Sequence, residues 1–295
     1  MNNIHDGISY IVPVFNEEDS ILNTIQRLKD ALEIIDIDYE IILVNDGSVD
    51  KTMEVISEIK DIVVISHPIN IGYGNAIKTG ITSAKYEWIG IVDADGTYNI
   101  EKLDVLVDEM KKGFDMVVAS RSNLYLIDSF LKRIFRWLFI FFIRFTINKR
   151  IEDPNSGFRI FKRSIALSFF PFLCGEFSFT TTLTIFCYGE ECFVRYLPIE
   201  YGKRTGNSKV KHIKDTFKTI HLIIQGIIYY NPIKFYLLFS IFMGVVVAFP
   251  AMVLAMLHMH TLALYFLIWG IASIFLIAIG VLGDIFRMGA FNKKR

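Results

Sequence analysis

The stretch that decides the fold is Trp88-Ile89-Gly90-Ile91-Val92-Asp93-Ala94-Asp95-Gly96. An apolar strand pattern runs directly into two carboxylates that are one residue apart. Two such carboxylates repel each other unless a cation lies between them, so helix capping, the simpler explanation for acidic residues after a strand, does not account for the pair. Magnesium is usually shared between one or two carboxylates and a substrate phosphate. The stretch therefore predicts a metal-binding turn at the end of a buried strand.

The same alternation of strand and helix patterns extends on both sides of this stretch. The expected strands are residues 8–14, 41–44, 62–66, 88–92 and 116–119, and the expected helices are residues 17–35, 52–60, 75–84 and 100–112. Near-continuous apolar strands separated by helices predict a parallel sheet that is covered on both faces. Such sheets bind ligands at the carboxyl ends of their strands.

Polar residues follow the first two strands as they follow the fourth, in segments 13–18 and 45–48. We therefore expect these segments and residues 93–96 to form one site at one edge of the sheet. For Asn16 and Ser48 taken alone, helix capping is an equal alternative. The glycine-rich segment 70–76 either cradles a nucleotide or forms a tight turn.

Composition excludes several classes of protein. The 295 residues contain 31 basic and 31 acidic side chains, and this balance argues against a nucleic-acid partner. Three scattered cysteines without a C-x-x-C pair argue against a disulfide framework and a structural zinc site. The chain has no G-x-G-x-x-G after its first strand and no P-loop motif, which argues against a dinucleotide cofactor and a P-loop nucleoside triphosphatase.

The C-terminal part of the chain has the pattern of a membrane anchor. Residues 235–283 contain no Asp, Glu, Lys or Arg, and about 20 apolar residues suffice for one helix to cross a bilayer. We expect two spans, at about 235–257 and 262–283, with a polar turn between them. A hairpin buried in a soluble core is the alternative, but soluble helices of this length usually have a polar face.

Basic residues set the expected orientation of the anchor. Lys residues precede the first span, Arg and Lys follow the second, and the turn has neither. By the positive-inside rule, the soluble domain and both termini face the cytoplasm at the cell (inner) membrane, in a multi-pass protein. The first residues lack the pattern of a signal peptide.

Two basic amphipathic segments, about 128–150 and 210–230, are expected to lie at the membrane surface. Ordinary helices packed on the protein core are the alternative for both. The predicted organisation is thus a cytoplasmic catalytic domain over residues 1–230, which includes these segments, and a two-helix anchor over residues 231–295.

The motifs at 12–18, 44–52, 70–80 and 92–96 together resemble the family-two glycosyltransferases. Further stretches at 119–121, 153–163 and 204–209 are similar to the polyprenyl-phosphate hexose transferases of that family, such as dolichol-phosphate mannose synthases and bacterial undecaprenyl-phosphate glucosyltransferases. The resemblance implies an α/β domain of the GT-A fold, which is Rossmann-like with a mostly parallel sheet. Amphipathic helices and a two-helix transmembrane anchor would follow it.

The resemblance also implies roles for residues on the donor side. The residues expected to contact the base and ribose of the nucleotide are Pro13, Phe15, Glu17 and Asp46. Asp93 and Asp95 are expected to hold Mg²⁺ or Mn²⁺ against the diphosphate. Thr97 stands where many family members have Gln.

On the acceptor side, Arg121 is expected to face phosphate and Asp153 to lie near the reacting centre, so that these two residues and Asp95 form the catalytic set. Arg204 and Lys209 would neutralise phosphate. The alternative for Arg121 is that it pairs with a local acid, and the alternative for Asp153 is that it caps a turn. Arg204 and Lys209 could otherwise simply be positive charges next to the membrane.

These expectations describe an inverting, metal-dependent transferase. It would move a sugar from a nucleoside-diphosphate sugar to a polyprenyl phosphate at the cytoplasmic membrane face, for the assembly or modification of cell-surface glycans. Its partners would be these two substrates and the lipid bilayer, with a homo-oligomer left open. One alternative is a family-two transferase that acts on a lipid-linked glycan or another membrane acceptor. Another is a non-catalytic membrane scaffold that retains the fold.

Overall fold

The computed structural model describes residues 7–123, 151–202 and 239–292, and isolated positions between 133 and 149. The chain divides into two compact units, Met1–Ile220 and His221–Arg295. This division falls in residues 203–238, outside the described residues. The predicted surface segment 210–230 lies outside them as well, and the segment 128–150 is described only at isolated positions.

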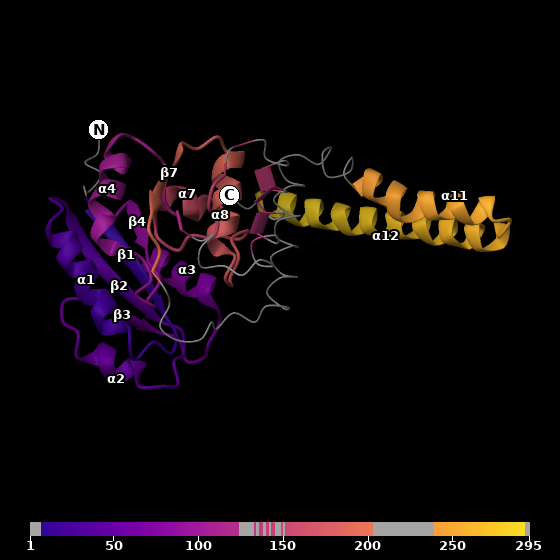
Figure 1. Ribbon diagram of the computed structural model, residues 1–295. Helices are drawn as coiled ribbons and strands as arrows, with labels where there is room; N and C mark the ends of the chain where they lie inside the picture. The colour runs from indigo at the N-terminus through magenta and orange to yellow at the C-terminus, as the bar shows by residue number, and fades with distance from the viewer. Residues whose placement is uncertain are drawn as a thin grey trace. The chain divides into compact units, whose positions relative to one another are not determined.

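The first unit is built on a seven-stranded sheet with the order β3-β2-β1-β4-β6-β5-β7 (Figure 1). The strands are β1 (Gly7–Val14), β2 (Asp38–Asn45), β3 (Val63–Ser66), β4 (Trp88–Ile91), β5 (Met116–Arg121), β6 (Arg159–Lys162) and β7 (Val194–Ile199). The first four strands, β1 to β4, run parallel to one another, and β5 is parallel to β7. β6 is antiparallel to both β4 and β5. The five predicted strands form, and the prediction of a mostly parallel sheet is confirmed, but β6 and β7 were not predicted.

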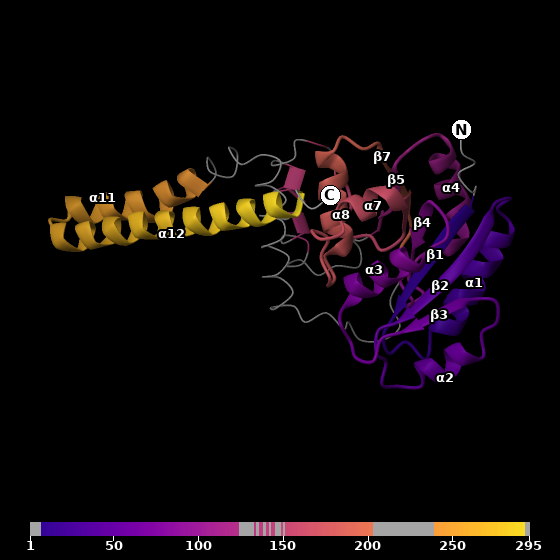
Figure 2. The ribbon, with the colours of Figure 1, turned by 180° about the vertical axis from the view of Figure 1, so that it is seen from behind.

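Helices cover both faces of this sheet, as Figures 1 and 2 show from opposite sides. The helices are α1 (Ile21–Glu33), α2 (Thr52–Ser57), α3 (Tyr73–Ser83), the 3₁₀ turn η1 (Ile100–Lys102), α4 (Leu103–Lys111), α7 (Arg163–Ser168) and α8 (Phe179–Gly189). The first helix begins at Ile21 and not at Glu17, because residues 18–20 form a turn in which Ser20 N and Ile21 N both donate to Glu17 O.

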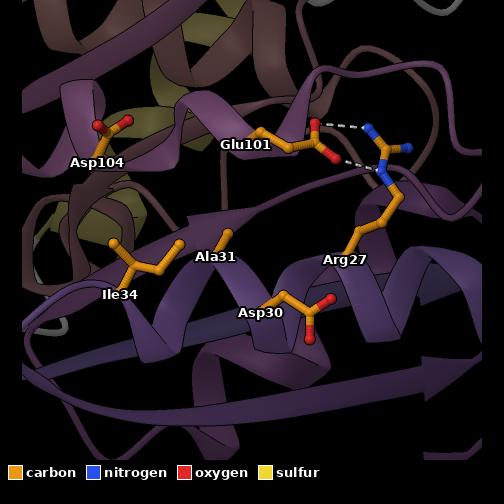
Figure 3. A pocket seen from close by; sticks show the side chains of 6 residues that line it. All are labelled: Arg27, Asp30, Ala31, Ile34, Glu101 and Asp104. Carbon is orange, nitrogen blue, oxygen red and sulfur yellow. Dashed lines mark hydrogen bonds and ion pairs between the residues drawn. The ribbon is translucent and has the colours of Figure 1, made fainter.

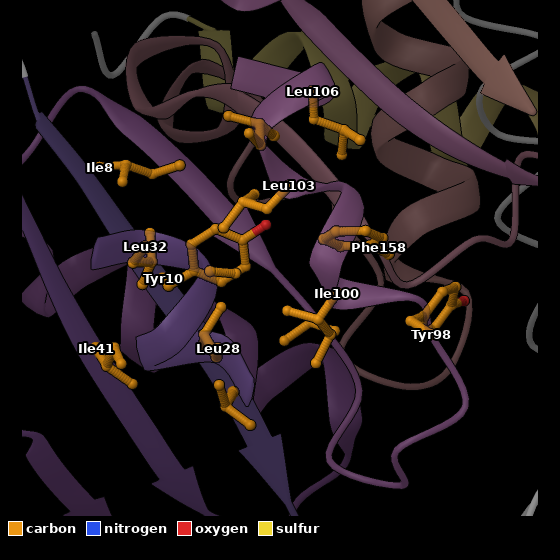
Figure 4. Packing of buried hydrophobic residues seen from close by; sticks show 14 of the residues in the cluster. Ile8, Tyr10, Leu28, Leu32, Ile41, Tyr98, Ile100, Leu103, Leu106 and Phe158 are labelled. Atoms are coloured by element: carbon orange, nitrogen blue, oxygen red, sulfur yellow. The ribbon is translucent and has the colours of Figure 1, made fainter. Parts of the chain in front are cut away.

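The core between the sheet and α1 and α4 explains why this face folds as it does (Figure 4). Alternate residues of β1, such as Ile8 and Tyr10, point toward Leu28 of α1 and Leu103 of α4, and all four side chains are fully buried. The alternation follows from the two-residue period of a strand. The next β1 residue, Ile11, therefore lies on the opposite face, against Gly80 of α3.

The second unit is a helical hairpin. It comprises a π-helical turn labelled η2 (Gly244–Ala248), α11 (Phe249–Met256) and α12 (His260–Asn292). Phe239–Met256 and His260–Ile279 are long and apolar enough to cross a membrane, with mean hydropathies of 2.3 and 2.5. This agrees with the two predicted spans, although α12 begins at His260, inside the predicted turn. Most side chains of both windows are exposed, which argues against a hairpin buried in a soluble core.

Small residues allow the two helices of the hairpin to approach closely. Ala251 of α11 and Ala263 of α12 are among its few buried positions. A Cβ on Gly270 would lie only 2.3 Å from Val247 Cγ1. Helices in lipid associate mainly through such close packing, since lipid tails are as apolar as the helix surfaces.

Candidate active site

The carboxyl ends of β1, β2 and β4 meet at one edge of the sheet, and the three predicted polar segments follow them there. The backbone N–H of Asn16 donates to Ser48 Oγ (2.9 Å), and Asn16 Oδ1 accepts from Val49 N (2.8 Å). Glu17 N donates to Thr52 Oγ1 (2.9 Å). The first two segments are thus bound together into one surface.

The residues expected near the nucleotide take two kinds of position. Pro13 is buried within β1, where it pairs with Val44 of β2. Phe15 and Glu17 lie in the loop that follows and are half-buried. Phe15 and Glu17 therefore lie at the edge where a ligand can reach them, whereas Pro13 supports the loop from inside the sheet.

Asp46 organises the turn before α3. Its carboxylate is 3% exposed and accepts hydrogen bonds from the backbone of Ile71 (3.0 Å) and Gly72 (2.9 Å). It also lies 2.8 Å from His67 Nδ1, whose other ring nitrogen is 3.0 Å from Thr79 Oγ1. Gly72 has a φ of 107°, so the tight-turn interpretation of the glycine-rich segment is confirmed at this residue.

One oxygen of each predicted metal-binding carboxylate is held by a hydroxyl donor. Asp95 Oδ1 accepts from Thr97 Oγ1 (2.6 Å) and from Thr97 N (3.1 Å). Asp93 Oδ1 accepts from the Tyr73 hydroxyl (2.7 Å). Burial has the largest effect on the pKa of Tyr73 and raises it, and the neighbouring Asp93 carboxylate raises it further. The hydroxyl therefore stays protonated and donates the hydrogen bond. A Cβ on Gly157 would lie 2.5 Å from Asp93 Oδ2, so a larger residue there would force the Asp93 carboxylate to move.

This pair of carboxylates fits a divalent cation that is shared with a phosphate group. Among the described residues, no group of three or more His, Cys, Asp or Glu could hold a metal by itself. Two carboxylates held in place by hydroxyl donors are, however, the kind of oxygen site that Mg²⁺ uses together with substrate phosphates. Asp93 and Asp95 would hold the cation, and Tyr73 and Thr97 would orient them.

Arg121 and Asp153, both predicted to be catalytic, form a buried ion pair. Arg121 Nε lies 2.6 Å from Asp153 Oδ2, and a terminal guanidinium nitrogen lies 2.7 Å from Oδ1. The side chains are 13% and 6% exposed. Burial alone would raise the pKa of Asp153, but the hydrogen bonds and charge of Arg121, helped by Arg136, outweigh it and lower the pKa. Asp153 is therefore ionised at neutral pH, and the sequence alternative of an Arg121 paired with a local acid is also realised.

Two tyrosines that we did not single out in the sequence connect the metal turn to this ion pair. The Tyr98 hydroxyl accepts from Gly157 N (2.6 Å), and its ring packs edge-on against Tyr201, with 5.0 Å between centroids. The guanidinium of Arg121 lies 5.4 Å from the Tyr201 ring centre. Gly202 N donates to Thr97 O (2.7 Å). Only the fold brings these segments together, because no local motif marks Tyr201.

Arg159 is a second residue that the sequence did not single out for a role. Its side chain is fully buried and donates to the backbone oxygens of Ser156 (2.9 and 2.6 Å), Pro154 (3.0 Å) and Thr180 (3.1 Å), and to Thr184 Oγ1 (2.9 Å). Burial lowers the pKa of its guanidinium. The residue fixes the segment after Asp153 against α8. In the sequence, the indication that Arg159 has a role was its position within the stretch 153–163, which is similar to the polyprenyl-phosphate hexose transferases.

Arg204 and Lys209, the two remaining predicted site residues, lie outside the described residues. Glu176 lies beside the turn before α3. A Cβ on Gly72 would come within 2.7 Å of Glu176 Oε2.

Comparison with known proteins shows the family of the chain. The profile of the family described as Glycosyl transferase family 2 matches residues 9–169, more than half of the chain. The chain belongs to this family. The matched range includes every predicted site residue except Arg204 and Lys209.

Curated relatives carry sugar-transferase names. One is undecaprenyl-phosphate 4-deoxy-4-formamido-L-arabinose transferase from Pseudomonas fluorescens (strain Pf0-1), 31% identical over 189 residues, which are 59% of this chain and 55% of the relative. Another is dolichyl-phosphate beta-glucosyltransferase from Dictyostelium discoideum, 30% identical over 189 residues, which are 56% of this chain and 57% of the relative. The chain therefore matches only a little over half the length of these relatives.

The fold is also similar to solved structures. One is glucosyl-3-phosphoglycerate synthase from Mycobacterium tuberculosis in complex with Mn²⁺, uridine-diphosphate-glucose and phosphoglyceric acid. It has a TM-score of 0.57 and 16% sequence identity, and the match covers 76% of this chain and 79% of that one. At this identity the likeness supports the α/β GT-A-like fold alone.

Proposed function

We propose that this protein transfers a sugar from a nucleoside-diphosphate sugar to a polyprenyl phosphate at a membrane surface. The observation that carries the proposal is the pair Asp93 and Asp95 at the end of β4, held by Tyr73 and Thr97, in a chain with two apolar helices. The names of the relatives from Pseudomonas fluorescens and Dictyostelium discoideum specify undecaprenyl-phosphate and dolichyl-phosphate, and so support a polyprenyl-phosphate acceptor.

The donor occupies the edge formed by the loops after β1, β2 and β4. Phe15, Glu17 and Asp46 border the nucleoside, and Pro13 supports the first loop. Asp93 and Asp95 hold Mg²⁺ or Mn²⁺, which when bound neutralises the charge that develops on the departing diphosphate. The Mn²⁺ and uridine-diphosphate-glucose in the complex of the Mycobacterium tuberculosis enzyme are consistent with a divalent cation in this fold.

The acceptor needs little activation, because its phosphate is already a nucleophile. A phosphate monoester has a second pKa of about 6, so it is largely dianionic at pH 7. We assign Arg121 to binding this phosphate and ionised Asp153 to holding the guanidinium in place. Arg204 and Lys209 supply further positive charge. Direct displacement by the phosphate oxygen inverts the anomeric carbon, so an α-linked donor gives a β-linked lipid sugar.

The hairpin of residues 239–292 keeps the catalytic domain at the bilayer, where a long isoprenoid acceptor resides. Basic residues flank the apolar helices on both sides and are absent from the turn between them. This pattern supports a cytoplasmic catalytic domain and cytoplasmic termini. The lipid-linked sugar would then serve the assembly or modification of cell-surface glycans.

The test uses membranes that contain the full chain, an added polyprenyl phosphate, Mg²⁺ or Mn²⁺, and a panel of labelled sugar nucleotides. Label from one donor should enter the organic-extractable phase and should be lost with Asp95→Ala. If no donor labels the lipid while the wild type still binds or hydrolyses a sugar nucleotide, the acceptor assignment is wrong. A family-two transferase that acts on another membrane acceptor then takes its place.

A further inference from the structure

Two side chains of α1 hold the backbone of the metal turn, residues 93–98. Thr24 Oγ1 donates to Ala94 O (3.0 Å). Arg27 donates from its two terminal nitrogens to Gly96 O (3.2 Å) and Tyr98 O (2.9 Å). The three carbonyls belong to alternate residues of the turn, so it is anchored along its whole length.

Thr24 is an unusual residue for its position. It lies on the buried face of α1 together with Ile21, Ile25 and Leu28, and its side chain is fully buried. Burying a hydroxyl is unfavourable unless the hydroxyl finds a hydrogen-bond partner, and valine would fill a similar volume without a polar atom. The bond to Ala94 O accounts for a threonine here. Ala94 is the residue between the two carboxylates.

Arg27 lies three residues further along α1, on the same side of the helix as Thr24. Its guanidinium is also aimed by Glu101, with nitrogen–oxygen distances of 2.7 and 2.8 Å, as the dashed lines in Figure 3 show. The pair is bidentate, but Glu101 is 56% exposed, so solvent screening keeps its contribution to stability modest. The two contacts with backbone carbonyls therefore explain why position 27 is an arginine better than the ion pair with Glu101 does.

The turn needs such anchors because its backbone is not regular. Gly96, the residue after Asp95, has a left-handed φ of 69°. The direction of each carboxylate depends on the backbone angles on both sides of it, and a turn with a glycine has more accessible conformations than a helix or strand. Fixing the carbonyls of Ala94, Gly96 and Tyr98 fixes the plane of every second peptide.

We propose that Thr24 and Arg27 are positioning residues of the metal site, which act through the backbone of residues 94–98 and touch neither metal nor substrate. The inference rests on the proposed function, because it takes Asp93 and Asp95 as the metal ligands. Loss of either anchor lets the turn move, and the carboxylates lose their alignment while the rest of the fold remains.

The test measures Mn²⁺ binding by the full chain in detergent, without turnover. Free Mn²⁺ is followed by its paramagnetic resonance signal during titration, in the presence of an equimolar mixture of UDP, GDP, CDP and ADP, and Asp95→Ala defines the baseline. Thr24→Val should weaken binding about tenfold, the lower end of the effect of losing an outer-shell partner. Thr24→Ser, which keeps the hydroxyl, should stay within about twofold of the wild type.

A matched pair separates the carbonyl contacts of Arg27 from its ion pair. Arg27→Met removes both and should weaken Mn²⁺ binding to a degree similar to Thr24→Val. Glu101→Gln removes only the charge opposite the guanidinium and should leave binding within about twofold. Thermal unfolding of each variant is recorded without metal. It shows how much of a change in Mn²⁺ binding comes from a loss of stability of the whole fold.

The outcomes distinguish this inference from the proposed function. If Thr24→Val and Arg27→Met bind Mn²⁺ like the wild type while only their melting temperatures fall, the two residues are structural and the inference is wrong. If Thr24→Ser weakens binding as much as Thr24→Val, the hydroxyl is not the cause and the inference is also wrong. If the wild type binds no more Mn²⁺ than Asp95→Ala does, the metal site of the proposed function itself is refuted.

Discussion

At the scale of single residues, the site depends on side chains that hold other side chains. Tyr73 holds Asp93, Thr97 holds Asp95, and Asp153 holds Arg121. Outer-shell partners of this kind matter because a metal or phosphate site tolerates little misalignment of its ligands. Two predictions follow at this scale.

The first concerns the hydroxyl of Tyr73. Tyr73→Phe removes the bond to Asp93 but keeps the ring, which stacks on Phe177 with 5.8 Å between centroids. We expect the metal concentration for half-maximal sugar transfer to rise about tenfold or more, with little change in the melting temperature. The measurement is a metal titration of the transfer rate.

The matched control for this variant is Tyr10→Phe. The Tyr10 hydroxyl is buried in the core and has no hydrogen-bond partner among the described residues. Its removal should leave the metal requirement unchanged and should not lower stability, because an unsatisfied buried hydroxyl is a cost to the folded state. Equal effects of the two variants on the metal requirement would refute the role of Tyr73.

The second prediction concerns the pH dependence of the ion pair. The pKa of Asp153 is lowered in the folded protein, so the pair stabilises the fold fully above the unfolded carboxyl pKa of about 4 and loses its effect as the pH falls through the folded value. Asp153→Asn leaves Arg121 buried without a charged partner. Breaking a buried ion pair in this way costs about 3–5 kcal/mol at neutral pH.

Unfolding by denaturant at a series of pH values checks this prediction. The difference in the free energy of unfolding between wild type and Asp153→Asn should be largest near pH 7 and should shrink below about pH 4. A difference that stays constant down to the acid limit would show that folding does not lower the pKa of Asp153, and a difference that grows as the pH falls would show that the folded protein keeps Asp153 protonated.

The sequence predicted the residues of this site better than their contacts. Asp93 and Asp95 were found because a repulsive pair after a buried strand has few explanations. Arg121 and Asp153 were each singled out, but their pairing with each other was not predicted, since 32 positions separate them. Tyr201 lacked any local signal, and Tyr73 was marked only by its place in segment 70–76, because their roles arise only when distant segments meet in the fold.

At the scale of elements, hydrophobic periodicity located the five strands of the parallel arrangement. It missed β6, which comprises only four residues and lies between β4 and β5 in the antiparallel direction. It also gave no account of α8, in which Thr180, Thr181, Thr182 and Thr184 are buried. A run of threonines favours strand by propensity, and here tertiary contacts with residues such as Arg159 and Asn155 override that preference.

The helical hairpin offers a prediction at this scale. Gly270→Leu places a large side chain against Val247 and should force α11 and α12 apart. Gly244→Leu is the control, because nothing lies within 4 Å of the Cβ position of Gly244, and it should be tolerated. Thermal denaturation in detergent, followed by size-exclusion chromatography of the tagged full chain, compares the two. A similar loss of stability in both variants would mean that close packing at Gly270 does not hold the hairpin together.

At the scale of the whole molecule, a catalytic domain and an apolar hairpin share one chain. The prediction here is that both termini are cytoplasmic and that the turn at residues 257–259, between α11 and α12, faces the other side. An epitope tag inserted in this turn should be accessible in intact cells, whereas a C-terminal tag should be accessible only after permeabilisation. The reverse pattern would contradict the proposed orientation.

The measurement that tests the central claim most directly compares two lipid acceptors that differ only in their phosphate. Purified full-length protein in nanodiscs receives a labelled donor identified by the panel assay and either polyprenyl phosphate or the matching polyprenol, with Mn²⁺ or with EDTA. We predict labelled lipid only with polyprenyl phosphate and Mn²⁺, and none with Asp95→Ala. Equal labelling of the polyprenol, or labelling of polyprenyl phosphate that persists in EDTA, would contradict metal-dependent transfer to a lipid phosphate.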